Sequence, residues 1–339
     1  MKKALLCFLM VNFLLLAGKK EVRWQRIFKL AGKDEPDYML FLPSDMKFDG
    51  KGNVYIADLK GCFLRKYSIK GKFLGEVGRE GSGPGEFRAP FKIFVQGESV
   101  FVWDMRLRRL SVFDTDLTYR RSYHLPFNIN DFFVVNGKIY ASVSSPHDLD
   151  NIFVINMKGD VLKKTLPVLP SYLKRNDKWL FLNRIRFGFM VLGYNPRLKK
   201  AAATFRGYDP RNFLYVFSPE EEKIKALPID FLKDHSFPDF LLKPPFRYPQ
   251  ASRQILVESI HPLDNGDFLI VLLEKNLRGK RTVLRKTLFI ILSKEGKIIA
   301  QNTLKGIFRI YDVLGDEALL KNMDEEEEIF QVWRINYEK

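Results

Sequence analysis

One segment recurs along this chain of 339 residues and diverges to a different degree in each copy. The clearest copy spans residues 49–74 and combines a glycine turn with two short runs rich in β-branched and aromatic residues, 54–57 and 63–67. The copies lie about 40 to 50 residues apart, a period typical of β-propellers, in which each repeat forms one four-stranded sheet, or blade. The sequence therefore predicts an all-β propeller fold.

The turns between the first and second strand of each repeat indicate the number of blades. Glycines mark five of them: Gly52, Gly97, Gly137, Gly266 and Gly315. The gap from Gly137 to Gly266 contains one further set of strand-like runs, 200–205 and 213–217, and Asn195 lies near the place of the missing glycine. Six repeats are therefore expected, which predicts a six-bladed β-propeller.

The last repeat lacks a strand. It begins near Ile307 and ends with the run 330–335, which leaves no room for a fourth strand. The segment 26–32 near the N-terminus resembles the outer strand 72–78 of the first repeat. We therefore predict that the N-terminal strand completes the last blade, because ring closure removes the exposed edges of an open array.

The first 18 residues are typical of an export signal. Lys2 and Lys3 precede an apolar run from Ala4 to Leu16, and small residues follow it. This run is shorter than the roughly 20 residues that a membrane span needs. The end of the run is similar to a lipoprotein cleavage box, but Lys19 stands where lipidation requires a cysteine.

These features predict an extracytoplasmic protein, periplasmic or at the cell surface. Residues 1–18 would be cleaved or kept as an anchor, and residues 19–339 would form a single six-bladed propeller. The membrane would be contacted only through the N-terminal segment. A cytosolic protein with an apolar first strand is the alternative.

Composition limits the partners and the covalent chemistry. Cys7 lies in the predicted signal, so Cys62 would be the single thiol of an exported chain, which could form no internal disulfide. The formal charge of +16 favours anionic partners but does not bear on the fold. Basic residues within strand-like runs, such as Arg65 and Arg109, are expected to face solvent.

The first repeat and the segment after it resemble NHL-repeat β-propellers. The resemblance rests on residues 49–58, on 63–74 and on the run Gly-Ser-Gly-Pro-Gly-Glu-Phe at 81–87. The chain is similar in particular to exported six-bladed propellers of gut and environmental bacteria, many of which are lipoproteins. The resemblance implies a binding or interaction module, since such families typically act in that way.

Long departures from the repeat fall in loops that share one face. In a propeller, the loops between second and third strands and those between blades surround the same mouth of the central channel. Four departures lie in such loops: 144–151, 167–184, 229–254 and 274–282. Loops on a rigid scaffold usually carry function, which favours this face as the binding face. Neutral drift of the insertions is the alternative.

Two groups of side chains are candidates on that face. Arginine suits bidentate capture of carboxylates and phosphates, and six arginines could form a basic rim for an anionic glycan, lipid headgroup or acidic protein: Arg106, Arg108, Arg206, Arg211, Arg278 and Arg281. Aromatic residues of the 229–254 insertion could form a lid, or a plug packed on the neighbouring blade: Phe237, Phe240, Phe246 and Tyr248.

A metal-dependent hydrolase or lyase is the first alternative function. A zinc-dependent amidating lyase has an NHL-type propeller, and three histidines could lie on the loop-rich face: His124, His147 and His235. Calcium-dependent lactonases are also six-bladed, and Asp58 and Asp104 end equivalent strands. In NHL repeats an aspartate there more often caps its own loop, and we favour that role.

We predict a non-enzymatic binding module without a cofactor, because no catalytic signature such as Gly-x-Ser-x-Gly or a phosphate loop occurs in the sequence. Its partner would be a protein, a glycan or another anionic ligand. Nucleic-acid binding, which some basic NHL propellers perform in the cytosol, is the second alternative, and the export signal argues against it.

Overall fold

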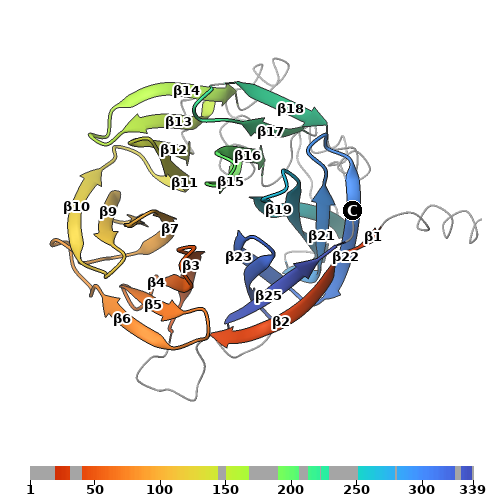
Figure 1. Ribbon diagram of the computed structural model, residues 1–339, viewed down its shortest axis with the longest axis horizontal. Helices are drawn as coiled ribbons and strands as arrows, with labels where there is room; N and C mark the ends of the chain where they lie inside the picture. Colours follow the sequence, from red (N-terminus) through yellow and green to blue (C-terminus); the bar gives the residue numbers. More distant parts are fainter. Residues whose placement is uncertain are drawn as a thin grey trace, which may run out of the picture.

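The computed structural model describes residues 20–30, 40–143, 150–167, 190–205, 213–221, 223–228, 251–278, 281–324 and 330–337. Its strands form six sheets around a central axis, like the blades of a fan (Figure 1). The prediction of an all-β six-bladed propeller is confirmed. Within these ranges no helix is long and apolar enough to cross a membrane.

Blades one to four each consist of four consecutive antiparallel strands, and the first strand of each blade lies nearest the axis. Blade one contains β3 (Pro43–Phe48), β4 (Asn53–Asp58), β5 (Phe63–Ser68) and β6 (Phe73–Val77). Blade two contains β7 (Pro90–Gln96), β8 (Ser99–Asp104), β9 (Arg109–Asp114) and β10 (Tyr119–His124). Blade three contains β11 (Ile129–Val135), β12 (Lys138–Val143), β13 (Asp150–Asn156) and β14 (Val161–Pro167). Blade four contains β15 (Met190–Asn195), β16 (Lys200–Phe205), β17 (Phe213–Phe217) and β18 (Ile224–Pro228).

Blades five and six both use the start of the chain. Blade six consists of β23 (Phe308–Leu314), β24 (Glu317–Asn322), β25 (Phe330–Asn336) and the N-terminal strand β2 (Arg23–Leu30), which pairs antiparallel with β25. The predicted closure is therefore confirmed. Blade five consists of β19 (Ala251–Pro262), β20 (Phe268–Arg278), β21 (Arg281–Leu292) and β22 (Ile298–Lys305), and β1 (Lys20–Glu21) adds a short parallel strand to β22.

Blade five also corrects one predicted loop. Residues 274–282 were expected to be an insertion, but 274–278 continue β20 and 281–282 begin β21, and the last pair of this ladder is Arg278 and Arg281. The ladder extends this far because β19 pairs with β20 from Ala251 onward, so residues 251–254 of the expected 229–254 insertion are strand as well.

The connections define two faces of the ring. On the turn face lie the short turns between first and second and between third and fourth strands. On the loop face lie the described connections between second and third strands and between blades, such as 59–62, 78–89 and 105–108. Two segments that were expected to be insertions, 168–189 and 229–250, lie outside the described ranges. The missing glycine of blade four is replaced by the turn 196–199, in which Lys199 takes the positive φ of 52°.

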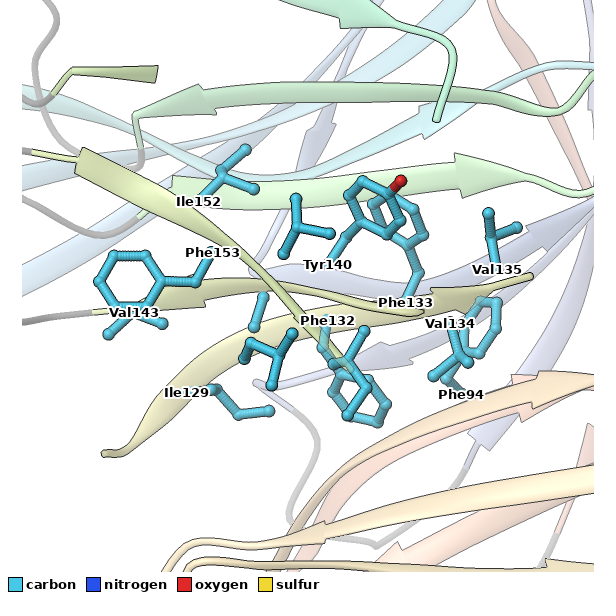
Figure 2. Packing of buried hydrophobic residues seen from close by; sticks show 14 of the residues in the cluster. Phe94, Ile129, Phe132, Phe133, Val134, Val135, Tyr140, Val143, Ile152 and Phe153 are labelled. Carbon is cyan, nitrogen blue, oxygen red and sulfur yellow. The ribbon is translucent and has the colours of Figure 1, made fainter. Parts of the chain in front are cut away.

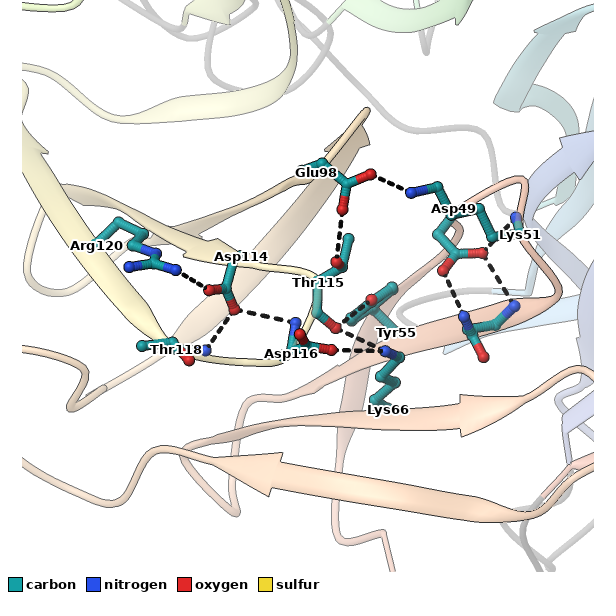
Figure 3. Close-up of polar contacts among 11 residues, drawn as sticks. Asp49, Lys51, Tyr55, Lys66, Glu98, Asp114, Thr115, Asp116, Thr118 and Arg120 are labelled. Carbon is teal, nitrogen blue, oxygen red and sulfur yellow. Dashed lines mark hydrogen bonds and ion pairs between the residues drawn. The ribbon is translucent and has the colours of Figure 1, made fainter.

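Polar contacts join blades one and two on the turn face (Figure 3). Glu98 binds Lys51 of blade one and accepts a hydrogen bond from Thr115 Oγ1. The Thr115 carbonyl in turn accepts from the Tyr55 hydroxyl at 2.9 Å and from Lys66 Nζ at 2.7 Å. Two neighbouring blades are thus held together at their turns.

Apolar side chains fill the space between neighbouring blades. Figure 2 shows the cluster around blade three, where Phe133 stacks on Tyr140 with ring centroids 4.9 Å apart. Tyr194 of blade four stacks on the same Phe133 at 4.7 Å. The large aromatic content of the sequence is therefore used to fill the wedge-shaped gaps between twisted sheets, where bulky flat rings pack well.

Candidate binding surface on the loop face

Two buried aspartates hold the loops of blades one and two. Asp58 accepts hydrogen bonds from four backbone N–H groups, those of Phe41, Leu42, Lys60 and Gly61. Asp104 does the same for Arg88, Ala89, Arg106 and Leu107, at 2.7 to 3.0 Å. Both carboxylates are fully buried. Each aspartate therefore fixes the entry of its blade and the loop after its second strand together, because one carboxylate satisfies donors from both segments.

The glycine-rich run 81–87 folds around a buried arginine. Arg109 is 4% exposed, and its guanidinium donates to the carbonyls of Ser82, Gly83 and Glu86. The Glu86 carboxylate accepts from the Gly83 N–H at 2.8 Å and binds Arg79. The expectation that Arg109 faces solvent is therefore wrong, since the carbonyls of a tight loop replace water around its charge.

Arg65 is a second correction of the same kind. It is 6% exposed, its Nε lies 2.6 Å from Glu76, and its guanidinium lies over the ring of Phe63 at 4.0 Å. An arginine within a strand is thus covered by a cross-strand acid and an aromatic ring. Neither arginine is available to a partner.

The exposed cationic and apolar side chains of these loops, eight in all, form a surface that we call the basic mouth. Five are cationic and three are apolar: Lys60, Arg79, Arg88, Arg106, Arg108, Phe41, Leu42 and Met105. Phe41 and Leu42 are 48% and 50% exposed. Among residues 40–42, 59–62, 78–89 and 105–108, Glu80 is the one exposed acid, and Glu86 is half-buried.

Hydrogen bonds make the basic mouth continuous across the two blades. The Leu59 N–H donates to the Leu42 carbonyl, and the Met105 N–H donates to the Ala89 carbonyl. Between the blades, Ser44 Oγ donates to the Pro90 carbonyl at 2.7 Å. The exposed side chains are therefore carried by a backbone that is hydrogen-bonded on both sides of the blade boundary.

Arg106 and Arg108, two predicted members of a basic rim, lie in this surface. Arg108 adopts a positive φ of 48°, as Cys62 does at the equivalent position of blade one with 55°, and its guanidinium donates to the Pro126 carbonyl. Burial raises the pKa of the Cys62 thiol, as do Glu80 and Asp104, whereas Arg106 opposes the rise. Sequence reasoning missed Lys60, Arg79 and Arg88, although two of them flank the glycine-rich run.

The other predicted site residues are not brought into this surface. Arg278 and Arg281 end the long ladder of blade five, and only their backbone is described. Eight further candidates lie outside the described residues: Arg206, Arg211, Phe237, Phe240, Phe246, Tyr248, His147 and His235.

Three candidate metal ligands lie within the described residues, and they are in different environments. His124 is exposed at the end of β10, whereas Asp58 and Asp104 each bind four backbone N–H groups. Across the described part of the chain, no three His, Cys, Asp or Glu side chains are grouped so that they could hold a metal ion.

Comparison with known proteins supports the fold. A model of the DUF5128 family, described as a 6-bladed beta-propeller, matches residues 44–168, which form blades one to three. This match does not separate NHL repeats from other propeller repeats. No curated protein is similar to the chain in sequence.

Two solved structures are similar over nearly the whole chain. A candidate exported protein from Bacteroides fragilis has a TM-score of 0.58 at 12% identity, over 94% of this chain and 96% of the other. A DUF4221 family member from Bacteroides vulgatus has a TM-score of 0.56 at 11% identity, over 94% and 99%. At these identities the similarity establishes the propeller architecture alone.

Proposed function

We propose that this protein is an exported, non-enzymatic binding module that docks an acidic partner protein on the basic mouth. The observation that carries the proposal is the grouping of five exposed cations with Phe41, Leu42 and Met105 on a hydrogen-bonded scaffold. Arginine, methionine and aromatic residues are the types enriched at protein interfaces. The excess of positive charge would steer a negatively charged partner to this face.

The rigidity of the loops supports binding without rearrangement. Asp58 and Asp104 fix the backbone under the exposed side chains, so little conformational entropy would be lost on docking. Export is part of the proposal and rests on the leader-like residues 1–18. A polyanionic glycan or a nucleic acid would also be attracted by the charge, but neither would use the three exposed apolar side chains in the same way.

Site-specific photocrosslinking in the native host tests this assignment. A photoreactive residue at Met105 should trap one partner, whereas the same residue at Leu162, which is exposed on the outer strand β14, should not. The partner is then purified, and its affinity is measured by calorimetry. The double variant Arg106→Ala/Arg108→Ala should bind at least about tenfold more weakly, about 1.4 kcal/mol.

A charge-matched control separates local contact from overall charge. Lys70→Ala/Lys72→Ala removes two exposed cations from the turn face and should leave the affinity unchanged. Equal loss in both double variants, or crosslinking to glycan or nucleic acid in place of protein, would overturn the proposal.

A further inference from the structure

The axis of the ring contains a cavity of about 630 Å³ that is separate from the basic mouth. All six innermost strands line it. Its lining extends to the turn face, where Gly50, Gly97, Pro196 and Arg197 border it. The exposed side chains of the basic mouth are not part of the lining, so the two regions can be varied independently.

Ionisable side chains of both signs face this cavity. Lys47 lies 3.4 Å from Asp312 and donates to the Tyr311 carbonyl at 2.7 Å. Arg309 Nε lies 2.7 Å from Glu258. Burial lowers the pKa of Lys47, but the carboxylates of Asp312, Asp45 and Asp131 more than offset this and raise it, so that Lys47 stays charged. The cavity is therefore an ionic environment inside the ring.

Two charged side chains that line the cavity, one cation and one anion, could each bind a further charged group. Lys92 lies 3.6 Å from Asp131, which is too long for a hydrogen bond, and its ammonium group makes no hydrogen bond to the described residues. Asp45 accepts the Ile93 N–H at 2.9 Å through Oδ2, and no cation of the described residues lies within ion-pair distance of it. Because Ile93 follows Lys92, these two opposite charges stand on either side of the boundary between blades one and two.

Such charges are costly at the centre of a fold. Partly buried ion pairs are commonly no more stabilising than apolar residues of similar volume, because desolvation offsets their attraction. The Lys92 and Asp131 side chains remain 26% and 21% exposed to the cavity, so they keep part of their hydration. An apolar plug at the axis would close the ring at least as well, which points to a role in recognition.

The other side of the cavity is aromatic. Phe94, Phe133 and Tyr194, from blades two, three and four, lie with neighbouring ring centroids 4.7 to 6.5 Å apart. His261 of blade five also lines the cavity, and its Nε2 lies 2.9 Å from Ser259 Oγ. Burial, together with Lys47 and Lys92, holds the pKa of His261 well below its usual value, so the imidazole is neutral. The cavity thus combines one pair of available opposite charges, a neutral imidazole and an apolar wall.

We propose that the axial cavity binds a small zwitterion with an aromatic or aliphatic body, of the size of an amino acid or dipeptide. The carboxylate of the ligand binds Lys92, its ammonium group binds Asp45, and its body packs toward Phe94, Phe133 and Tyr194. The ligand enters from the turn face. A ligand with a single charge would leave either the Lys92 ammonium without a hydrogen-bond acceptor or the Asp45 carboxylate without a cation in a poorly hydrated site.

Binding of matched probes to the full-length exported form tests the cavity. The probes are phenylalanine, the free dipeptide Ala-Phe, and the N-acetyl and C-amide forms of each, measured by thermal shift and calorimetry. The zwitterionic probes should bind saturably, and blocking either terminus should weaken binding at least about tenfold. Singly charged forms that bind as tightly as the free forms, or no thermal shift with any zwitterion at about 10 mM, would overturn the proposal.

Variants locate the bound probe. Lys92→Met and Asp45→Asn preserve size, and Asn can still accept the Ile93 N–H, so both should fold and melt close to wild type. Each should weaken binding of the free probe at least about tenfold. Lys51→Met, at an exposed turn-face position, and Arg106→Ala/Arg108→Ala, in the basic mouth, should leave it unchanged. Unchanged affinity in Lys92→Met would contradict the assignment, whatever partner the basic mouth binds.

Discussion

On both faces of the ring, side-chain oxygens accept hydrogen bonds from backbone N–H groups. The two faces differ in which segments of the chain these hydrogen bonds join. On the turn face, Asp49, Asp114 and Asn156 each accept two backbone N–H groups two and four residues ahead, within one exposed turn. On the loop face, Asp58 and Asp104 are buried, and each joins two segments that are 15 or more residues apart. The turn-face side chains shape local turns, whereas the loop-face carboxylates hold tertiary structure.

This difference explains which face can vary. A turn that satisfies its own backbone needs no neighbour, so the turn face stays short and regular. The loop face concentrates stability in a few buried anchors, and the connections between those anchors are free to change length and side chains. Exposed residues such as Arg106 can therefore be placed around Asp104 without disturbing it.

The largest expected effect comes from removing β2, the strand that completes blade six and runs between the two faces of the ring. Deletion of residues 22–32 removes β2 and leaves β25 with an open edge. Loss of this ladder and of Val22, which is fully buried beside blade five, should abolish cooperative unfolding and yield an insoluble or molten product. Chemical denaturation followed by fluorescence measures this. A truncated chain that melts as cooperatively as wild type would show that the ring does not depend on its closure.

A smaller effect separates the two kinds of aspartate. Asp104→Ala leaves four backbone N–H groups without their acceptor in a buried site, and should lower the free energy of unfolding by about 3 kcal/mol. Asp114→Ala, at the end of β9 on the turn face, should cause a much smaller loss, because water can replace its oxygen. Urea denaturation of both variants measures the difference. Equal losses would remove the distinction between the faces.

The smallest effect concerns two histidines in different environments. The pKa of buried His261 is lowered by burial and by Lys47 and Lys92, so the unfolded chain binds a proton more readily than the folded one. The contribution to stability is present above about pH 6.5 and is lost as the pH falls below it, at about 1.4 kcal/mol per pH unit.

Comparison of two substitutions isolates that contribution. His261→Gln should lose stability less steeply than wild type between pH 7.5 and 5.5, as measured by urea denaturation. His124→Gln changes an exposed residue at the end of β10 and should keep the wild-type pH dependence. The same pH dependence in all three proteins would mean that His261 is not held neutral by the fold.

Much of the fold could be predicted because its signals are local. Glycines such as Gly52 and Gly97 have positive φ in turns between strands, and this conformation is readable from residue type alone. The N-terminal strand could be placed because residues 26–32 carry the same pattern as an outer strand of blade one. The loop 274–282 was predicted wrongly because strand pairing, not residue type, keeps residues 274–278 and 281–282 extended.

The candidate sites could be predicted only in part. Arg106 and Arg108 were identified because the repeat register puts them in a loop of the loop face, but Arg109, the next residue, has the same charge and is buried. Nothing in the local sequence distinguishes the exposed arginine from the buried one, since the carbonyls that cover Arg109 come from residues 82–86, more than 20 positions away.

The sequence by itself determined the number of blades, the turns between their strands and the need for an N-terminal strand to close the ring, because each depends on short-range residue patterns. Only the tertiary structure decided which charges are buried and that an axial cavity exists. The reason is distance along the chain: Lys47 binds the Tyr311 carbonyl 264 residues away. Such contacts arise only when the first and last blades meet.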